Sequence, residues 1–290
     1  MMSKSKVIAI VGATASGKSA YAVELAKKID GEIISADSRL VYKGFNVACA
    51  KPSLEERGGI PHFMMDIVEP EFDYSAGLYV KDAKKCINDI ISRGKIPIIA
   101  GGTGLYFRVL LENYDLPQVE PDYEYRKELN KLEKEELYSL LEEKDSVCAA
   151  KIDKNDKKKI IRALEVCYVS GHPMSELQGI KEPEFEVEWI GRNFQRNILY
   201  DRINKRVDMM FENGIVDETK YLLEKHGRIP NIIYTIGYQE VVEFLDGRLT
   251  LEQAKDKLKQ NTRNYAKRQL TWFRKNPEIK WNVYPDKLKK

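Results

Sequence analysis

Short, mostly apolar runs alternate with longer amphipathic stretches in the first third of the chain. The runs VIAIV at 7–11, EIISA at 32–36 and IPIIA at 96–100 have the composition of strands buried on both faces of a parallel sheet. Between them, residues 18–28 and 76–93 carry apolar side chains at helical spacing. This alternation predicts an α/β fold built on a doubly wound, mostly parallel sheet.

The pattern changes after Pro117. Residues 122–145 are dense in Glu and Lys, with leucines at helical spacing, and a second helix is predicted over 156–170, ending before Gly171 and Pro173. Strand character returns at 185–190, and further helices are predicted over 202–213, 216–225, 238–246 and 251–275. We therefore predict a core of residues 1–118 and 189–290, interrupted by a helical insertion of residues 119–188.

Charge and cysteine content change this picture little. Lys and Arg number 48 against 45 Asp and Glu, and the net charge of +3 is too small by itself to indicate a nucleic-acid ligand. Four scattered cysteines and only three histidines argue against a zinc site and favour free thiols in a reducing cytosol. No stretch approaches the roughly 20 apolar residues of a membrane span, and the run at 7–11 is too short for a signal peptide. We expect a soluble, cytoplasmic protein with no membrane partner.

One motif is specific for phosphate. The stretch GATASGKS fits G-x-x-x-x-G-K-[ST], follows a predicted strand and opens a predicted helix, as a P-loop requires. Its glycines allow backbone N–H groups to surround phosphate oxygens. Lys18 is expected to neutralise the outer phosphate, and the Ser19 hydroxyl to reach Mg²⁺. The diphosphate- or nucleotide-binding residues are therefore Gly12, Ala13, Thr14, Ala15, Ser16, Gly17, Lys18 and Ser19.

Two further strand ends carry candidate site residues. Asp37 and Ser38 follow the strand EIISA, where a side chain points into the ligand crevice of a parallel sheet, although an ordinary turn aspartate fits the pattern equally well. The stretch Gly101-Gly102-Thr103-Gly104 follows the third strand and could present N–H groups and a hydroxyl to an anion, or form a plain turn. All three predicted strand ends open on one edge of the sheet. This convergence favours a role in the site for each of the three loops over an ordinary turn.

The stretch 261–275 (NTRNYAKRQLTWFRK) is basic and contains interleaved aromatic residues. At helical spacing Arg263, Lys267, Arg274 and Arg268 share a broad face that would suit a phosphate backbone. A solvated basic side of an amphipathic helix is the more common meaning of such a pattern, and taken alone we favour it. The basic cluster at 157–162 (KKKIIR) is open to the same two interpretations.

Taken together, these segments closely resemble the bacterial tRNA dimethylallyltransferases, also called tRNA isopentenyltransferases. The resemblance runs in order along nearly the whole chain. Its stretches are GATASGKS at 12–19, ISADSRLVYKGFNVACAKPS at 34–53, GKIPIIAGGTGLY at 94–106, NDKKKIIRALEV at 155–166, RINKRVDMM at 202–210, IGYQE at 236–240 and NTRNYAKRQLTWFR at 261–274. Ala13, Leu40, Cys49, Lys158 and Lys159 depart from the usual family residues, and Leu40 puts one base contact in doubt.

The resemblance implies transfer of a dimethylallyl group from dimethylallyl diphosphate to N6 of adenosine 37, beside the tRNA anticodon. It implies that Asp37 is the base, that Thr103 lies near the diphosphate and the target nucleotide, and that Lys18 and Arg206 act on the diphosphate. Mg²⁺ is the implied cofactor, with Ser19 as its protein ligand. The insertion would grip the anticodon stem-loop, and we expect a monomer.

The resemblance also reverses our preference for the basic segments, which now become expected tRNA contacts. The expected tRNA-binding residues are Asp37, Ser38, Arg39, Leu40, Thr103, Arg126, Lys158, Lys159, Ile160, Ile161, Arg162, Gly237, Tyr238, Gln239, Lys267, Arg268, Gln269 and Arg274. Three alternatives stay open at this point: a small-molecule kinase, a prenyltransferase acting on free adenine nucleotides, and an RNA-binding protein whose P-loop is only structural.

Overall fold

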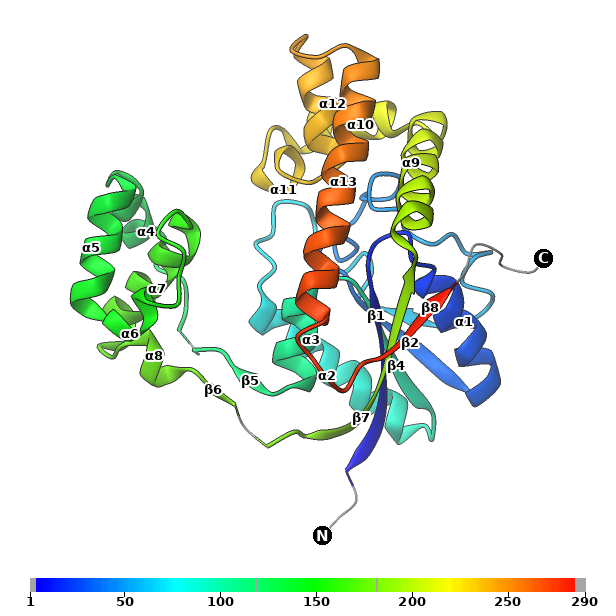
Figure 1. Cartoon of the computed structure of the whole chain (residues 1–290), viewed down its shortest axis with the longest axis horizontal. Coiled ribbons are helices and arrows are strands. Elements are labelled where there is room, and N and C mark those ends of the chain that lie inside the picture. The colour runs from blue at the N-terminus through cyan, green and yellow to red at the C-terminus, as the bar shows by residue number, and fades with distance from the viewer. Residues whose placement is uncertain (1–3, 118, 181, 285–290) are drawn as a thin grey trace. The chain divides into compact units, whose positions relative to one another are not determined.

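The computed structural model describes residues 4–117, 119–180 and 182–284 (Figure 1). The chain divides into a core unit, Met1–Leu110 with Glu184–Lys290, and an insertion unit, Leu111–Pro183. These boundaries fall several residues before those expected from the sequence, at 118/119 and 188/189. No helix in the described part of the chain is both long and apolar enough to cross a membrane.

A six-stranded parallel sheet forms the centre of the core unit. Its order is β3-β2-β4-β1-β7-β8, and every pairing between neighbours is parallel. The strands are β1 (Ser5–Gly12), β2 (Gly31–Ala36), β3 (His62–Phe63), β4 (Ile96–Gly101), β7 (Phe185–Phe194) and β8 (Lys280–Tyr284). The three strands predicted to carry site residues, β2, β4 and β1, are direct neighbours, so their carboxyl ends meet at one edge, as the doubly wound prediction requires.

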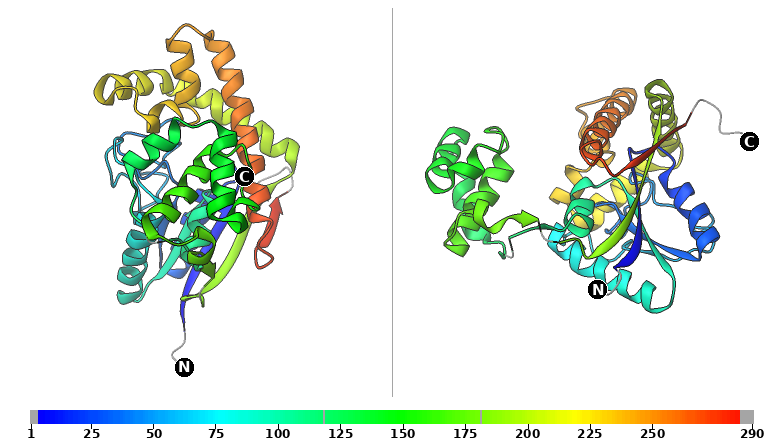
Figure 2. Two further views of the ribbon diagram at one scale, coloured as in Figure 1. Left: turned by 90° about the vertical axis from the view of Figure 1, so that its left-hand side faces the viewer. Right: turned by 60° about the horizontal axis from the view of Figure 1, so that its bottom comes forward.

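Helices cover both faces of this sheet (Figure 2). Because side chains alternate along a strand, Ile190 of β7 packs on the face covered by α1 (Lys18–Ile29). Its neighbour Trp189 points to the other face, where its ring lies 6.0 Å from Phe107 of α3 (Gly104–Leu111). Phe107 lies 5.6 Å from Phe273 of α13 (Leu251–Phe273), so α3 and α13 cover that second face. The helix α2 (Ala76–Ser92) completes this part of the core.

The C-terminal third of the core unit is a helical assembly. It contains α9 (Arg196–Glu212), α10 (Ile215–His226), α11 (Pro230–Ile233) and α12 (Tyr238–Leu245), together with α13. Helices α9, α10, α12 and α13 pack together through the buried side chains of Val207, Met210, Ile215, Val241 and Leu258. The long helix α13 runs beside α9 in all the views (Figures 1 and 2).

The insertion unit has its own apolar core. Its helices are α4 (Tyr123–Asn130), α5 (Lys134–Lys144), α6 (Ser146–Ala149), α7 (Lys157–Ser170) and α8 (Met174–Leu177). Leucines from α4, α5 and α7 are buried against one another, including Leu129, Leu137, Leu141 and Leu164. The chain enters and leaves this unit through an antiparallel ribbon of β5 (Tyr114–Asp115) and β6 (Gly179–Ile180).

Candidate functional site

The P-loop lies between the end of β1 and the start of α1. Gly12 has a φ of 150°, and a Cβ there would lie 2.2 Å from the carbonyl oxygen of Arg192, so only glycine fits. Gly17 has a left-handed backbone with a φ of 77° and precedes the first turn of α1. No side chain caps that helix, and its first turn contains no acidic residue. The N–H groups at this helix end are therefore available to an anion.

Two cations lie close together at this loop. The Lys18 Nζ donates a hydrogen bond to the Ala13 carbonyl oxygen at 2.6 Å. Burial lowers the pKa of Lys18 to about 7, and the nearby Arg206 guanidinium contributes to the decrease. Burial also lowers the pKa of Arg206, whose Nε has no hydrogen-bond partner among the described residues. Two half-buried cations this close together make a site that a multiply charged anion would complete.

Asp37 shares the surroundings of these cations. Burial lowers the pKa of Lys18 and of Arg206, and the negative charge of Asp37 raises both again. The Asp37 carboxylate therefore lies near both cations. Asp37 Oδ1 accepts a hydrogen bond from the N–H of Arg39 at 2.8 Å, an interaction that fixes the turn after β2. The three groups that the resemblance assigned to catalysis from three separate segments are therefore brought together in the fold.

Thr103 connects the ends of β4 and β2. Its Oγ1 accepts a hydrogen bond from the N–H of Ser38 at 3.0 Å, and its own N–H donates to the Ala36 carbonyl oxygen at 3.1 Å. A Cβ at Gly101 would lie 2.2 Å from that same carbonyl oxygen, so the close approach of the two strand ends depends on glycine. Thr103 thus supports the turn that carries Asp37.

Two arginines beside the P-loop were missed by the sequence analysis. A Cβ on Gly17 would lie 3.9 Å from Nη2 of Arg192 and 4.0 Å from Nη2 of Arg202. The guanidinium of Arg192 lies 4.3 Å from the Tyr21 ring centroid and 3.8 Å from that of Tyr284, and Arg202 Nε donates to the Ala15 carbonyl oxygen at 2.8 Å. Arg192 pairs with Gly12 across β7 and β1.

A metal would find few protein ligands here. The described residues contain no group of three or more His, Cys, Asp or Glu side chains that could hold one. Ser19 is exposed at the start of α1, and Ser16 is buried with an Oγ that has no partner in the described chain. The hydroxyl of Ser19 fits a Mg²⁺ ion that takes its other ligands from a diphosphate and water.

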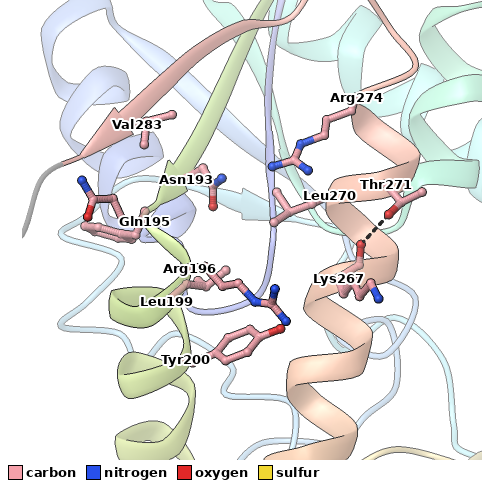
Figure 3. Close-up of a pocket in the computed structure, with 11 residues that line it drawn as sticks. Asn193, Gln195, Arg196, Leu199, Tyr200, Lys267, Leu270, Thr271, Arg274 and Val283 are labelled. Atoms are coloured by element: carbon pink, nitrogen blue, oxygen red, sulfur yellow. Dashed lines mark hydrogen bonds between the residues drawn. The ribbon is translucent and has the colours of Figure 1, made fainter.

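A pocket of about 400 Å³ lies between the end of β7, the first turns of α9 and the second half of α13 (Figure 3). Lys267, Arg274 and Arg196 line it, and Figure 3 shows the guanidinium groups of Arg196 and Arg274 turned into the space between the helices. No carboxylate lines the pocket. The buried Asn193 also lines it, with an Oδ1 that has no partner in the described chain. The surface suits a phosphorylated ligand, and Arg196 was not anticipated.

Not every expected tRNA contact lies on the surface. Gln269 is only 6% exposed, and both ends of its amide are bonded inside the core. Tyr238 is fully buried, with its hydroxyl donating to Glu218, and Leu40 is 8% exposed. The Tyr238 side chain packs in an apolar cluster with Tyr42 and Phe45, so it serves the core. Gly237 and Gln239 lie beside Tyr238 at the start of α12.

In the insertion unit, the expected arginine contacts are bonded to a buried carboxylate. Glu165 accepts hydrogen bonds from Arg126 Nε at 2.7 Å and from Nη1 of Arg162 at 2.5 Å. Ile160 and Ile161 belong to the apolar core, so RNA could reach only their main chain. Arg39 in the core unit is similarly held, since it donates to side chains of α11 and the turn after it.

The surface cations differ among themselves. Lys158 and Lys159 are exposed at the start of α7, and Lys159 pairs with Asp156 at 2.6 Å. On α13, Arg268 is exposed and its guanidinium lies 5.7 Å from the Tyr265 ring centroid. The cations lining the pocket have no such acidic partner among the described residues and remain the strongest candidates for binding RNA phosphate.

The parallel sheet, the loop GATASGKS between β1 and α1 and the cations beside it define an α/β protein of the P-loop class. Within that class, the IPP transferase family matches residues 40–276, and the isopentenyl transferase family matches residues 5–66. The chain belongs to the IPP transferase family.

The similarity to individual relatives covers nearly all of this chain and most of each relative. The tRNA dimethylallyltransferase of Carboxydothermus hydrogenoformans is 46% identical over 283 residues, covering 95% of this chain and 91% of the relative. The solved tRNA isopentenylpyrophosphate transferase of Bacillus halodurans is 40% identical with a TM-score of 0.74, covering 98% and 91% of the two chains. A eukaryotic dimethylallyltransferase solved while acting on tRNA is 31% identical with a TM-score of 0.85, covering 97% and 74%.

Proposed function

We propose that this protein transfers a dimethylallyl group from dimethylallyl diphosphate to N6 of adenosine 37 in tRNA and releases diphosphate. Transfer to tRNA is supported by membership of the IPP transferase family and by relatives named for that reaction. The observation that carries the chemistry is that Asp37 after β2, Lys18 after β1 and Arg206 of α9 lie close enough for their charges to interact. It combines a base with a cationic diphosphate site.

The first half of the reaction breaks the bond between C1 of the dimethylallyl group and the bridging oxygen. Negative charge then builds on the departing diphosphate. The free N–H groups at the start of α1, together with Lys18 and Arg206, stabilise that charge because they are fixed before the reaction begins. A Mg²⁺ ion held by Ser19 would neutralise further charge on the diphosphate oxygens.

The second half forms the bond between C1 and N6 of the adenine. An exocyclic amine is a poor nucleophile because its lone pair is delocalised into the ring, so loss of its proton must accompany attack. Asp37 Oδ1 is occupied by the Arg39 N–H, whereas no hydrogen bond engages Oδ2 within the described residues. Oδ2 is therefore the oxygen that takes the N6 proton.

The target adenine is normally stacked in its loop and must leave the stack to reach Asp37. The pocket lined by Arg196, Lys267 and Arg274 gives the RNA backbone a cationic surface on the core unit. The anticodon stem-loop contacts this surface under the proposal, and the insertion unit supplies RNA contacts of its own. The protein works as a monomer in the cytoplasm under this proposal.

The direct test is transfer from labelled dimethylallyl diphosphate, with Mg²⁺, to an unmodified anticodon stem-loop, with AMP as a parallel acceptor. Label is expected in the stem-loop and not in AMP. Asp37→Asn should lower kcat by about 10²- to 10⁴-fold, because the carboxamide keeps the shape but cannot accept the proton. Asp30→Asn is the matched control, since Asp30 precedes β2 at the opposite edge of the sheet and is 79% exposed.

Other outcomes separate the alternatives. Label in AMP and not in the stem-loop would identify a prenyltransferase of free nucleotides. Absence of label from both acceptors would contradict the proposal, and turnover of γ-labelled ATP would then point to a kinase. Equal activity in Asp37→Asn and Asp30→Asn would remove Asp37 from the mechanism.

A further inference from the structure

Gln269 occupies an unusual position on α13. Its neighbours Lys267 and Arg268 are exposed, whereas Gln269 is 6% exposed and points into the core. Its Oε1 accepts a hydrogen bond from the N–H of Thr14, in the P-loop, at 2.8 Å. Its Nε2 donates to the carbonyl oxygen of Gly102, after β4, at 3.0 Å. One amide thus joins two loops that are far apart in the sequence.

The fit around this amide is tight. A Cβ at Gly102 would lie 2.1 Å from Nε2 of Gln269, so no side chain is accommodated there. Three residues further along α13, Trp272 lies so close to Gly104 that a Cβ on that glycine would be 2.2 Å from Trp272 Cδ1. Helix α13 therefore contacts Gly102, in the loop after β4, and Gly104, the first residue of α3, through side chains about one helical turn apart.

The same loop supports the proposed base. Gly102 is followed by Thr103, whose Oγ1 accepts the N–H of Ser38, the residue after Asp37. A continuous series of hydrogen bonds and peptide links thus runs from Thr14 through Gln269 and Thr103 to Asp37. Because a buried amide with both ends satisfied is costly to disrupt, this series fixes the separation between the two loops.

We propose that Gln269 is a positioning residue that holds the diphosphate-binding loop and the base-bearing loop in register. This proposal rests on the proposed function. It gives Gln269 an internal role in place of the RNA contact implied by the family resemblance. The N–H of Thr14 is then occupied by Gln269, and the N–H groups at the start of α1 are left for the diphosphate.

The test uses Gln269→Met, which keeps the length of the side chain and removes both hydrogen bonds. Gln260→Met is the matched control because Gln260 is exposed on the same helix. Binding of inorganic diphosphate with Mg²⁺ is measured by titration calorimetry, and kcat and both KM values by prenyl transfer. Gln269→Met should weaken diphosphate binding about tenfold and lower kcat, since a buried hydrogen bond is lost at each loop. The KM for the stem-loop should stay unchanged, as should every value for Gln260→Met.

A second variant keeps the proposal testable if Gln269→Met fails to fold. Gly102→Ala leaves Gln269 in place but displaces its amide from the other side, and it should show the same pattern. Wild-type diphosphate binding in both variants would overturn the proposal, as would a raised KM for the stem-loop with diphosphate binding unchanged. Failure of the wild-type protein to transfer a prenyl group would refute the proposed function, whereas the diphosphate titration would still decide the role of Gln269.

Discussion

The ammonium of Lys18 changes protonation near neutral pH in the ligand-free protein, because burial and Arg206 lower its pKa to about 7. A bound diphosphate would raise that pKa again by supplying opposite charge. We therefore predict that diphosphate binding at pH 7–8 is accompanied by uptake of a proton at Lys18. Affinity should fall as the pH rises through 7, since the neutral amine must first be protonated.

Titration calorimetry in buffers of different ionisation enthalpy measures this uptake. Lys18→Met supplies the baseline, because the diphosphate's own titration is common to both proteins. Identical proton uptake by the two proteins would show that Lys18 does not change protonation on binding.

Single residues differ in how far the sequence reveals them. Lys18 and Ser19 belong to a contiguous motif that is recognised from local spacing alone, so the sequence is enough to propose them. Arg192 and Arg202 reach the P-loop through strand pairing and helix packing, which no local pattern records. Gln269 stands in a basic stretch, where its polarity suggested exposure, but its two partners lie 255 and 167 residues away along the chain.

At the scale of elements, Glu165 joins two helices of the insertion unit. It is fully buried on α7 and accepts hydrogen bonds from the Asp122 N–H, which begins α4, and from Arg126 and Arg162. Burial alone would raise the pKa of Glu165, but these hydrogen bonds outweigh it and lower the pKa. The carboxylate is therefore charged at neutral pH and organises the packing of α4 on α7.

We predict that Glu165→Gln destabilises this unit by about 2 kcal/mol. Removing one partner of a buried ion pair costs more than that, but both arginines are roughly one third exposed and water screens them. Hydrogen exchange should accelerate in α4 and α7 and stay unchanged in the core unit. Glu143→Gln is the control, since Glu143 and its partner Lys144 are both well exposed. Equal exchange in the two variants would contradict a stabilising role.

Element prediction succeeded where apolar spacing is regular. The strands β1, β2 and β4 and the helices α1, α2 and α13 were predicted to within a few residues. The helix α9 begins at Arg196, well before the expected residue 202, and its first turn already buries Ile198 and Leu199. The edge strand β8 (Lys280–Tyr284) was missed, since it is only five residues long and none of them is buried. The strand β8 is defined by its parallel pairing with β7, which lies 86 or more residues earlier in the chain and which local composition does not reveal.

At the scale of the whole molecule, RNA affinity should depend on a few unpaired cations and not on net charge. We predict that changing Arg196, Lys267 and Arg274 together to Ala weakens stem-loop binding and reduces the slope of log affinity against log salt by about 2. Fluorescence anisotropy across a salt series measures this. The control is Lys28→Ala with Lys81→Ala, exposed lysines of α1 and α2. An unchanged slope in the triple variant would exclude the pocket as an RNA-binding surface.

The ribbon of β5 and β6 has a consequence for how this chain could have been assembled. Tyr114 pairs with Ile180 and Asp115 with Gly179, so the two ends of the insertion unit lie side by side. Closing such a short gap with a tight turn costs little chain entropy, and each unit buries its own apolar side chains. A gene encoding the core alone would therefore need only a few extra codons at this junction. The segment between β5 and β6 can therefore be replaced by a different domain without a change to the sheet of the core unit.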